Sequence, residues 1–221
     1  MNVVPKSYVA FFDLDKTILS INSGKILVKK ARKSGLMSSS DFLTALYYSL
    51  LYKFHLKNTD EIISGMGKWL NGIEVGKVVD LCESIVKGFL VPAIRPEIIE
   101  EFNFHRGRNA ELVILSSAMS QICLPVGHFL NFDSVICTEM QEINGTFTGL
   151  PQTKFCFQDE KRYQIIKYCE LMSYSKEDAY YYGDSIADLP ALETVGNPVC
   201  ISPDKKLKKI ARSNEWKIYN W

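Results

Sequence analysis

The stretch that decides the fold lies near the N-terminus and reads Tyr8-Val9-Ala10-Phe11-Phe12-Asp13-Leu14-Asp15-Lys16-Thr17. It opens with a continuous apolar run of β-branched, aromatic and small side chains, which is typical of a parallel strand buried on both faces. Two aspartates, two positions apart, follow this run directly. Because ligands bind beyond the carboxyl ends of parallel strands, the stretch predicts a functional site at that edge of a sheet.

Two further motifs have the same form, with polar residues directly after an apolar run. They read Val113-Ile114-Leu115-Ser116-Ser117 and Tyr182-Gly183-Asp184-Ser185-Ile186-Ala187-Asp188. From residue 95 onward, strand-like and helix-like segments alternate, which predicts an α/β fold with a doubly wound parallel sheet covered on both faces. We therefore expect the three motifs to meet at one edge of that sheet.

The region between the first two motifs differs, because it contains helix-like segments and no convincing strand. One of these helices is predicted to begin at Thr59, where a hydroxyl side chain followed by two acidic residues is a typical N-cap. We predict that residues 1–20 and 93–221 form the α/β core and that residues 21–92 form an inserted, all-helical cap. Within the core, Asn144-Gly145 predicts a β-hairpin.

Composition excludes several classes of protein. The 221 residues carry 26 Lys and Arg against 25 Asp and Glu, so the net charge of +1 gives no field to attract nucleic acid or an acidic membrane. A hydrophobic fraction of 47% is typical of a globular chain. The N-terminal apolar run is too short for a signal peptide, and no window reaches the roughly 20 apolar residues of a membrane span. We therefore predict a cytoplasmic protein with no nucleic-acid partner and no membrane span; its oligomeric state is left open.

The aspartates in the first and third motifs point to a metal. Clustered carboxylates repel one another unless a cation lies among them, and ligands that are all oxygen favour Mg²⁺. Such an ion attracts a phosphate, whose phosphorus an ordered carboxylate can attack. Attack of one anion on another requires a nearby positive charge, so we expect a lysine in the site. Lys161, near the start of a predicted helix, is the first choice and Lys154 the second.

The whole pattern resembles the four motifs of the haloacid dehalogenase (HAD) superfamily. The matching residues are Asp13-x-Asp15-x-Thr17, Ser116 after its strand, Lys161, and Gly183-Asp184-Ser185-x-x-Asp188. The sequence is most similar to the phosphoserine-phosphatase-like branch, subfamily IB, which has a helical C1-type cap after the first motif. The stretch Asp188-Leu189-Pro190-Ala191-Leu192 is also similar to that branch.

This resemblance implies a Mg²⁺-dependent phosphomonoesterase that hydrolyses a small phosphorylated metabolite through an aspartyl-phosphate. Asp13 would be the nucleophile, and Asp15 would be the general acid for the leaving group and then the general base for water. The Asp13 and Asp184 carboxylates and the main-chain carbonyl of Asp15 would hold Mg²⁺, with Asp188 supporting it. The groups that would bind the phosphate are Ser116, Ser117 and Lys161, of which Lys161 also balances charge.

Three alternatives stay open at this point. A phosphotransferase or mutase on the same fold would pass the phosphoryl group to a sugar rather than to water. A signalling phosphoacceptor that resembles receiver domains also uses an aspartate, Mg²⁺, a hydroxyl residue and a lysine. Asp15 argues against this second reading, because a receiver domain has no acid two residues after its phosphorylated aspartate. The third alternative is a phosphoserine phosphatase proper.

Two positions argue against phosphoserine as the substrate. Phosphoserine phosphatases carry a glutamate nine residues after the nucleophile, where this chain has Asn22. They also carry an arginine after a Phe-x-x-Ala-Leu segment of the cap; here Phe42-Leu43-Thr44-Ala45-Leu46 is followed by Ser49 at that position. Both differences remove a charge that an amino-acid zwitterion needs, so we expect phosphoserine to be a poor substrate.

Overall fold

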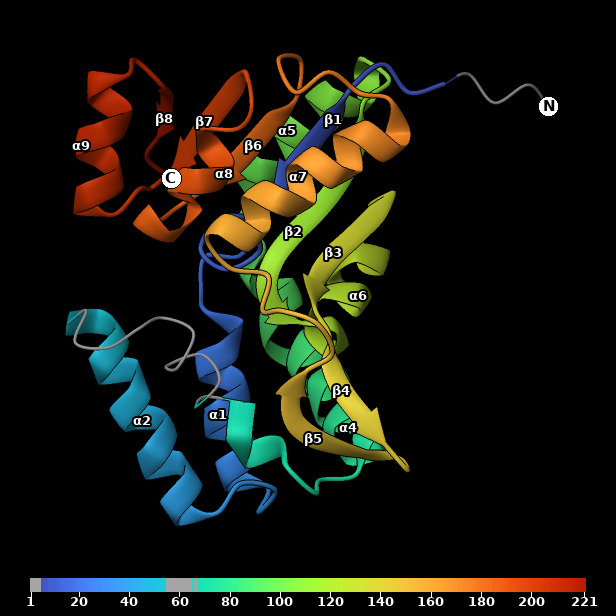
Figure 1. The fold of residues 1–221 in the computed structure, drawn as a ribbon, viewed down its shortest axis with the longest axis vertical. Helices are drawn as coiled ribbons and strands as arrows, with labels where there is room; N and C mark the ends of the chain where they lie inside the picture. The colour runs from blue at the N-terminus through green and yellow to red at the C-terminus, as the bar shows by residue number, and fades with distance from the viewer. Residues whose placement is uncertain (1–4, 55–64, 66) are drawn as a thin grey trace.

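A six-stranded parallel sheet forms the centre of the computed structural model, which describes residues 5–54, 65 and 67–221 (Figure 1). The strand order is β3-β2-β1-β6-β7-β8, and each neighbouring pair is parallel. The chain runs outward from β1 to β3 and then returns to place β6 on the other side of β1, which confirms the predicted doubly wound α/β fold. The strands are β1 Val9–Phe12, β2 Glu111–Met119, β3 Ser134–Thr138, β6 Tyr180–Gly183, β7 Asn197–Ile201 and β8 Lys217–Tyr219.

Both faces of the sheet are covered by helices, as the continuous apolar run of β1 predicts. Ala10 and Phe12 belong to one hydrophobic cluster, and Val9 and Phe11 belong to the other. This alternation follows from the two-residue period of a strand. Helices α5 (Pro96–Gly107) and α6 (Ser120–Phe129) cover the first face, and the second is covered by α7 (Asp159–Met172), α8 (Leu189–Leu192) and α9 (Lys205–Ser213).

The segment between β1 and α5 is helical over most of its described residues. Its elements are α1 (Ser23–Lys33), α2 (Ser39–Phe54), the 3₁₀ turn η1 (Lys68–Leu70), α4 (Val75–Ile85), the π-helical turn η2 (Val86–Leu90) and the 3₁₀ turn η3 (Val91–Ala93). The helix predicted to start at Thr59 begins on positions outside the described residues. The division into a core and a cap at residues 20 and 93 stays a prediction.

The predicted hairpin forms and reaches the inserted segment. Strands β4 (Met140–Ile143) and β5 (Thr146–Pro151) are joined by Asn144 and Gly145, which both have positive φ. Val75 at the start of α4 donates its backbone N–H to the Gly145 carbonyl, and Gly72 donates to Phe147. Figure 1 shows this hairpin extending beyond the sheet toward α4. The base of the inserted segment is therefore tied to the hairpin by backbone hydrogen bonds.

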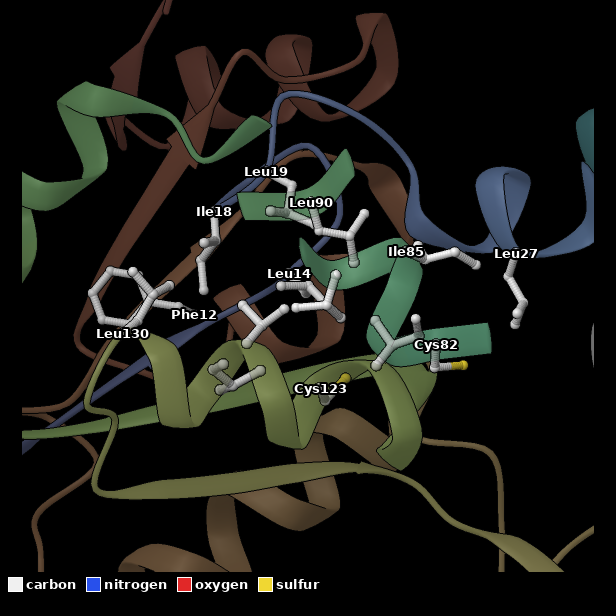
Figure 2. Packing of buried hydrophobic residues seen from close by; sticks show 14 of the residues in the cluster. Phe12, Leu14, Ile18, Leu19, Leu27, Cys82, Ile85, Leu90, Cys123 and Leu130 are labelled. Carbon is white, nitrogen blue, oxygen red and sulfur yellow. The ribbon is translucent and has the colours of Figure 1, made fainter. Parts of the chain in front are cut away.

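One hydrophobic cluster joins the sheet to the inserted helices (Figure 2). Leu14, Ile18 and Leu19 of the loop after β1 are fully buried, so this loop is anchored by its apolar side chains. They share the cluster with Leu27 of α1, with Cys82 and Ile85 of α4, and with Cys123 of α6. The loop that carries the two N-terminal aspartates is thus held between the sheet and the insertion, which limits its freedom to move.

Strand β2 is longer than predicted. The apolar run ends at Leu115, but the strand continues to Met119 with an irregular register against β3. Ser116 and Ser117 consequently lie within β2 and not in the loop after it. All six cysteines are free thiols. None of the helices in the described residues is long and apolar enough to cross a membrane, and the cytoplasmic location stays a prediction.

Candidate active site

The first and third motifs meet at the point where the strand order reverses. Strands β1 and β6 are neighbours with Phe12 opposite Tyr182, so Asp13 and Asp184 follow adjacent strands at the same edge of the sheet. The backbone N–H of Asp13 donates to the Tyr182 carbonyl at 2.9 Å, which fixes the end of β1 against β6. Both aspartates are buried. This is the sheet edge at which open parallel sheets bind their ligands.

Lys161, on the first turn of α7, lies inside this acidic cluster. Its Nζ donates to Asp13 Oδ1 at 2.6 Å and to Asp188 Oδ1 at 2.7 Å, and its side chain is almost completely buried. Burial by itself lowers the pKa of this lysine, but the two carboxylates outweigh it and raise the pKa well above the usual value. Lys161 is therefore an ammonium ion. The alternative, Lys154, is exposed and lies 4.0 Å from Glu160.

Asp188 is satisfied by hydrogen bonds on both carboxylate oxygens. Oδ1 accepts from Lys161 and from the Tyr181 hydroxyl, while Oδ2 accepts from the backbone N–H groups of Asp184 and Ser185. Burial raises the pKa of Asp188, but the Lys161 ammonium and these hydrogen bonds lower it overall. Asp188 is therefore ionised, and it is hydrogen-bonded to Lys161 and to the backbone at the start of the following turn.

Asp13 and Asp184 lack comparable compensation. Burial raises the pKa of Asp13 from 3.8 to about 7; Asp188 and Asp15 add to the rise, and Lys161 offsets only part of it. Burial, with Asp188 and Asp13 nearby, raises the pKa of Asp184 from 3.8 to about 8. In the described residues, the cation that pairs with Asp184 is Lys16, whose Nζ lies 4.0 Å from an Asp184 carboxylate oxygen and whose side chain is mostly exposed. The site thus carries more buried carboxylate than its cations balance.

This excess fits a divalent cation. Carboxylate oxygens of Asp13, Asp184 and Asp188 lie within 4.8 Å of one another, close enough to surround one ion. Because the Asp188 oxygens already accept hydrogen bonds from the protein, Asp13 and Asp184 are the carboxylates best placed to ligate it. An all-oxygen set without His or Cys suits Mg²⁺.

The Asp15 side chain contacts the start of the inserted segment. Its Oδ1 accepts the backbone N–H of Ser23, at the start of α1, at 2.8 Å. Burial raises the pKa of Asp15, while the hydrogen bonds from Ser23 partly offset that rise. The next residue, Lys16, has a left-handed φ of 62°, and its carbonyl accepts a hydrogen bond from the Arg95 guanidinium.

The two serines of the second motif differ in exposure. Ser116 is buried, and its Oγ accepts the backbone N–H of Ala118 at 3.3 Å. Ser117 is exposed, and its carbonyl accepts from the Thr138 hydroxyl. Because Phe12 pairs with Ile114, β2 brings Ser116 to the same sheet edge as Asp13.

Of the two positions that argue against phosphoserine, the structure describes the side chain of one, Asn22. Asn22 is the N-cap of α1, and its Oδ1 accepts the Lys25 backbone N–H at 2.9 Å. Its amide oxygen is therefore already used in starting the helix. Ser49 lies in α2, and its side chain is not among those that the structure describes.

One residue of the cluster was not predicted from the sequence. Tyr181 is completely buried on β6, and its hydroxyl contacts both Lys161 and Asp188. In the sequence, Tyr181 stands between two other tyrosines in a strand, a pattern that indicates core packing. Only its place on the same face as Lys161, which depends on the packing of α7, distinguishes it from its neighbours.

The family model for haloacid dehalogenase-like hydrolases matches residues 10–193, and the chain belongs to this family. It is therefore an enzyme of the hydrolase class. Its relatives include an inhibition of morphological differentiation protein from Streptomyces azureus, 28% identical over 96% of this chain and 78% of that protein. A histidinol-phosphatase from Neisseria meningitidis serogroup C is 25% identical over 96% of this chain and 98% of its own length.

Solved structures share the same fold. A protein of unknown function from Bordetella pertussis Tohama I superimposes with a TM-score of 0.88, covering 97% of this chain and 99% of that one. The two sequences are 19% identical, so the likeness concerns the fold alone.

Proposed function

We propose that the chain is a Mg²⁺-dependent phosphomonoesterase that acts on a small phosphorylated metabolite and forms an aspartyl-phosphate on Asp13. One arrangement supports this function above all others. The buried ammonium of Lys161 donates a hydrogen bond to one carboxylate oxygen of Asp13. Asp184, which follows the neighbouring strand, has no comparable cationic partner among the described residues. Such a site attracts a cation and, with it, a dianionic phosphate.

The reaction divides into two displacements at phosphorus. A carboxylate oxygen of Asp13 forms a bond to phosphorus while the bond to the leaving-group oxygen breaks, and Asp15 gives its proton to that oxygen. Asp15 then removes a proton from water, whose oxygen attacks phosphorus as the bond to Asp13 breaks. Orthophosphate leaves, and both aspartates return to their starting states. The raised pKa of Asp15 favours its proton-bearing form before the first step.

Mg²⁺, when bound by Asp13, Asp184 and the Asp15 carbonyl, would neutralise charge between nucleophile and phosphate. Asp188 would support this site through Lys161 and through the backbone of Asp184. Ser116, with main-chain N–H groups near it, would bind phosphoryl oxygens. Ser117 is a second candidate for that contact.

Turnover of a panel of phosphomonoesters with Mg²⁺ tests this function. The panel contains phosphoserine and sugar, amino-alcohol and lipid-like phosphates, and liberated orthophosphate is measured. Appearance of a phosphorylated acceptor in place of orthophosphate would identify a phosphotransferase instead. A wild-type enzyme without orthophosphate release on every member would contradict the proposal.

Within that panel, phosphoserine is expected to have a low kcat/KM. Asn22 offers a neutral amide where an ammonium needs a carboxylate, and its oxygen already caps α1. A kcat/KM for phosphoserine about tenfold or more above that of every other member would contradict this reading of Asn22.

Asp15→Asn is expected to act selectively on substrates with poor leaving groups. An alkyl phosphate needs a proton on its leaving oxygen, so its kcat should fall by about 10²- to 10⁴-fold. An aryl phosphate with an acidic phenol needs no proton and should lose far less. The measurement is kcat for both substrate types with wild-type and variant enzymes. Equal losses on the two types would assign Asp15 to structure or to metal binding.

A further inference from the structure

The Tyr181 hydroxyl completes the surroundings of the Lys161 ammonium. It accepts a hydrogen bond from Lys161 Nζ at 2.9 Å and donates its own proton to Asp188 Oδ1 at 2.8 Å. A neutral tyrosine has one proton to donate and lone pairs with which to accept, so both bonds form at once. Tyr181 is 0% exposed, so its hydroxyl is shielded from the bulk water that would otherwise compete for these hydrogen bonds.

The number of N–H groups on Lys161 makes this contact informative. An ammonium has three N–H groups, and three acceptors surround Nζ: Asp13 Oδ1, Asp188 Oδ1 and Tyr181 Oη. Two carboxylates alone would leave one N–H without a protein partner in a buried site. With Tyr181 in place, every N–H is used. The expectation that Lys161 also binds substrate phosphate therefore requires one of these three bonds to break.

We propose that Tyr181 is a positioning residue for catalysis: its hydroxyl takes the third N–H of Lys161 and so fixes Asp13 for attack. In this arrangement Lys161 acts on the nucleophile, and the phosphoryl oxygens are bound by other donors. This inference rests on the proposed function, because the reaction is the one in which Asp13 attacks phosphorus. Nothing in it requires Tyr181 to touch the substrate.

The local chain provides the space that this arrangement needs. A Cβ on Gly183 would lie 2.8 Å from Asp188 Cβ and 2.9 Å from Tyr181 Cε1, too close for either side chain to stay in place. Gly183, the last residue of β6, thus allows the tyrosine ring and Asp188 to approach Lys161 together. Tyr182, which follows Tyr181 in β6, points to the opposite face of the sheet and forms hydrogen bonds with Glu101 and His105.

Tyr181→Phe tests the inference because it removes only the hydroxyl and keeps the ring that packs in the core. We expect kcat to fall by about 10- to 100-fold while KM changes by less than about threefold, since a small misplacement of the nucleophile affects attack and not binding. A tyrosine with a purely packing role would leave kcat unchanged. A kcat within about twofold of wild type would overturn the inference.

Tyr182→Phe is the matched control. It removes a buried hydroxyl from the same strand, but that hydroxyl bonds to Glu101 and His105 and has no contact with Lys161 in the described structure. We expect a lower Tm and a kcat within about twofold of wild type. If Tyr182→Phe lowers kcat as much as Tyr181→Phe does, the effect is a general one of the strand and the inference fails.

Inhibition by orthophosphate tests the second part of the inference, that the phosphoryl oxygens are bound by donors other than Lys161. Removal of the Tyr181 hydroxyl returns one N–H of Lys161 to the site, so orthophosphate should inhibit Tyr181→Phe with a Ki about threefold or more below that of wild type. Inhibition no tighter than in wild type would overturn the idea that Tyr181 withholds an N–H from phosphate. If wild type itself hydrolyses no phosphomonoester, the proposed function has failed; if wild type is active and Tyr181→Phe is equally active, only this inference has failed.

Discussion

Asp13→Asn is expected to abolish turnover, with kcat lower by about 10³-fold or more, while the protein stays folded. An amide is a poor nucleophile and forms no stable acyl-phosphate, so the first displacement at phosphorus has no acceptor. The amide oxygen still accepts from Lys161, and the side chain has the same shape as the carboxylate. Loss of one negative charge from a cluster in which burial raises the pKa of Asp13 to about 7 removes repulsion.

Asp159→Asn provides the control for this substitution. Asp159 is also an aspartate next to a cationic side chain, with its Oδ1 3.4 Å from Arg162, but 83% of its side chain is exposed. We expect its kcat and Tm to match wild type, because exposed ion pairs contribute little. Initial rates and thermal melts of the three purified proteins give the measurement. Activity above a few per cent of wild type in Asp13→Asn would exclude Asp13 as the nucleophile.

The part of this candidate site that lies at the ends of strands could be predicted from the sequence. The buried strand before Asp13 and the strand before Asp184 need only be neighbours for the two aspartates to meet, and the order reversal at β1 makes them so. Lys161 could be named because attack of an anion on a phosphate needs a cation. These predictions depend on local pattern and charge, which the sequence displays directly.

Features that depend on tertiary packing could not be predicted. The side chain of Tyr181 faces Lys161 because α7 packs on that face of β6, and nothing in a run of three tyrosines indicates it. The contact between Gly145 of the hairpin and Val75 of the insertion joins segments that are 70 residues apart, which no local pattern reveals. The extension of β2 to Met119 likewise depends on pairing with β3.

Removal of the metal is expected to abolish activity, and Mg²⁺ is expected to restore it. Two buried carboxylates, Asp13 and Asp184, remain without a full complement of positive charge, so a bound cation is needed before a phosphate can approach them. Ca²⁺ should be a poor substitute, because its looser coordination misaligns an in-line attack. Orthophosphate release is measured after EDTA treatment and again after addition of each ion. Full activity in a metal-free preparation would contradict the proposed metal site.

From the raised pKa values of Asp13 and Asp184 we predict how the stabilisation of the fold by Mg²⁺ depends on pH. The pKa of Asp184 is raised from 3.8 to about 8, so the folded state holds this proton more tightly than the unfolded state does. The stability that this proton contributes is fully present below the unfolded pKa and is lost as pH rises through about 8. Asp13, with a pKa of about 7, acts in the same direction. Without metal, Tm should therefore fall between pH 6.5 and pH 8.5.

Mg²⁺ should reverse this loss, because it binds the ionised carboxylates of the folded state. We expect the rise in Tm on adding Mg²⁺ to be about 5 °C or more larger at pH 8.5 than at pH 6.5. His105 opposes this fall only near pH 6.5: burial lowers its pKa to about 4, so it is neutral in the folded state, whereas the unfolded imidazole loses its proton around pH 6.5. Asp184→Asn removes one of the two ligands and should shrink the difference. A Mg²⁺ effect on Tm that is equal at both pH values would show that ionisation of Asp13 and Asp184 is not what the cation compensates.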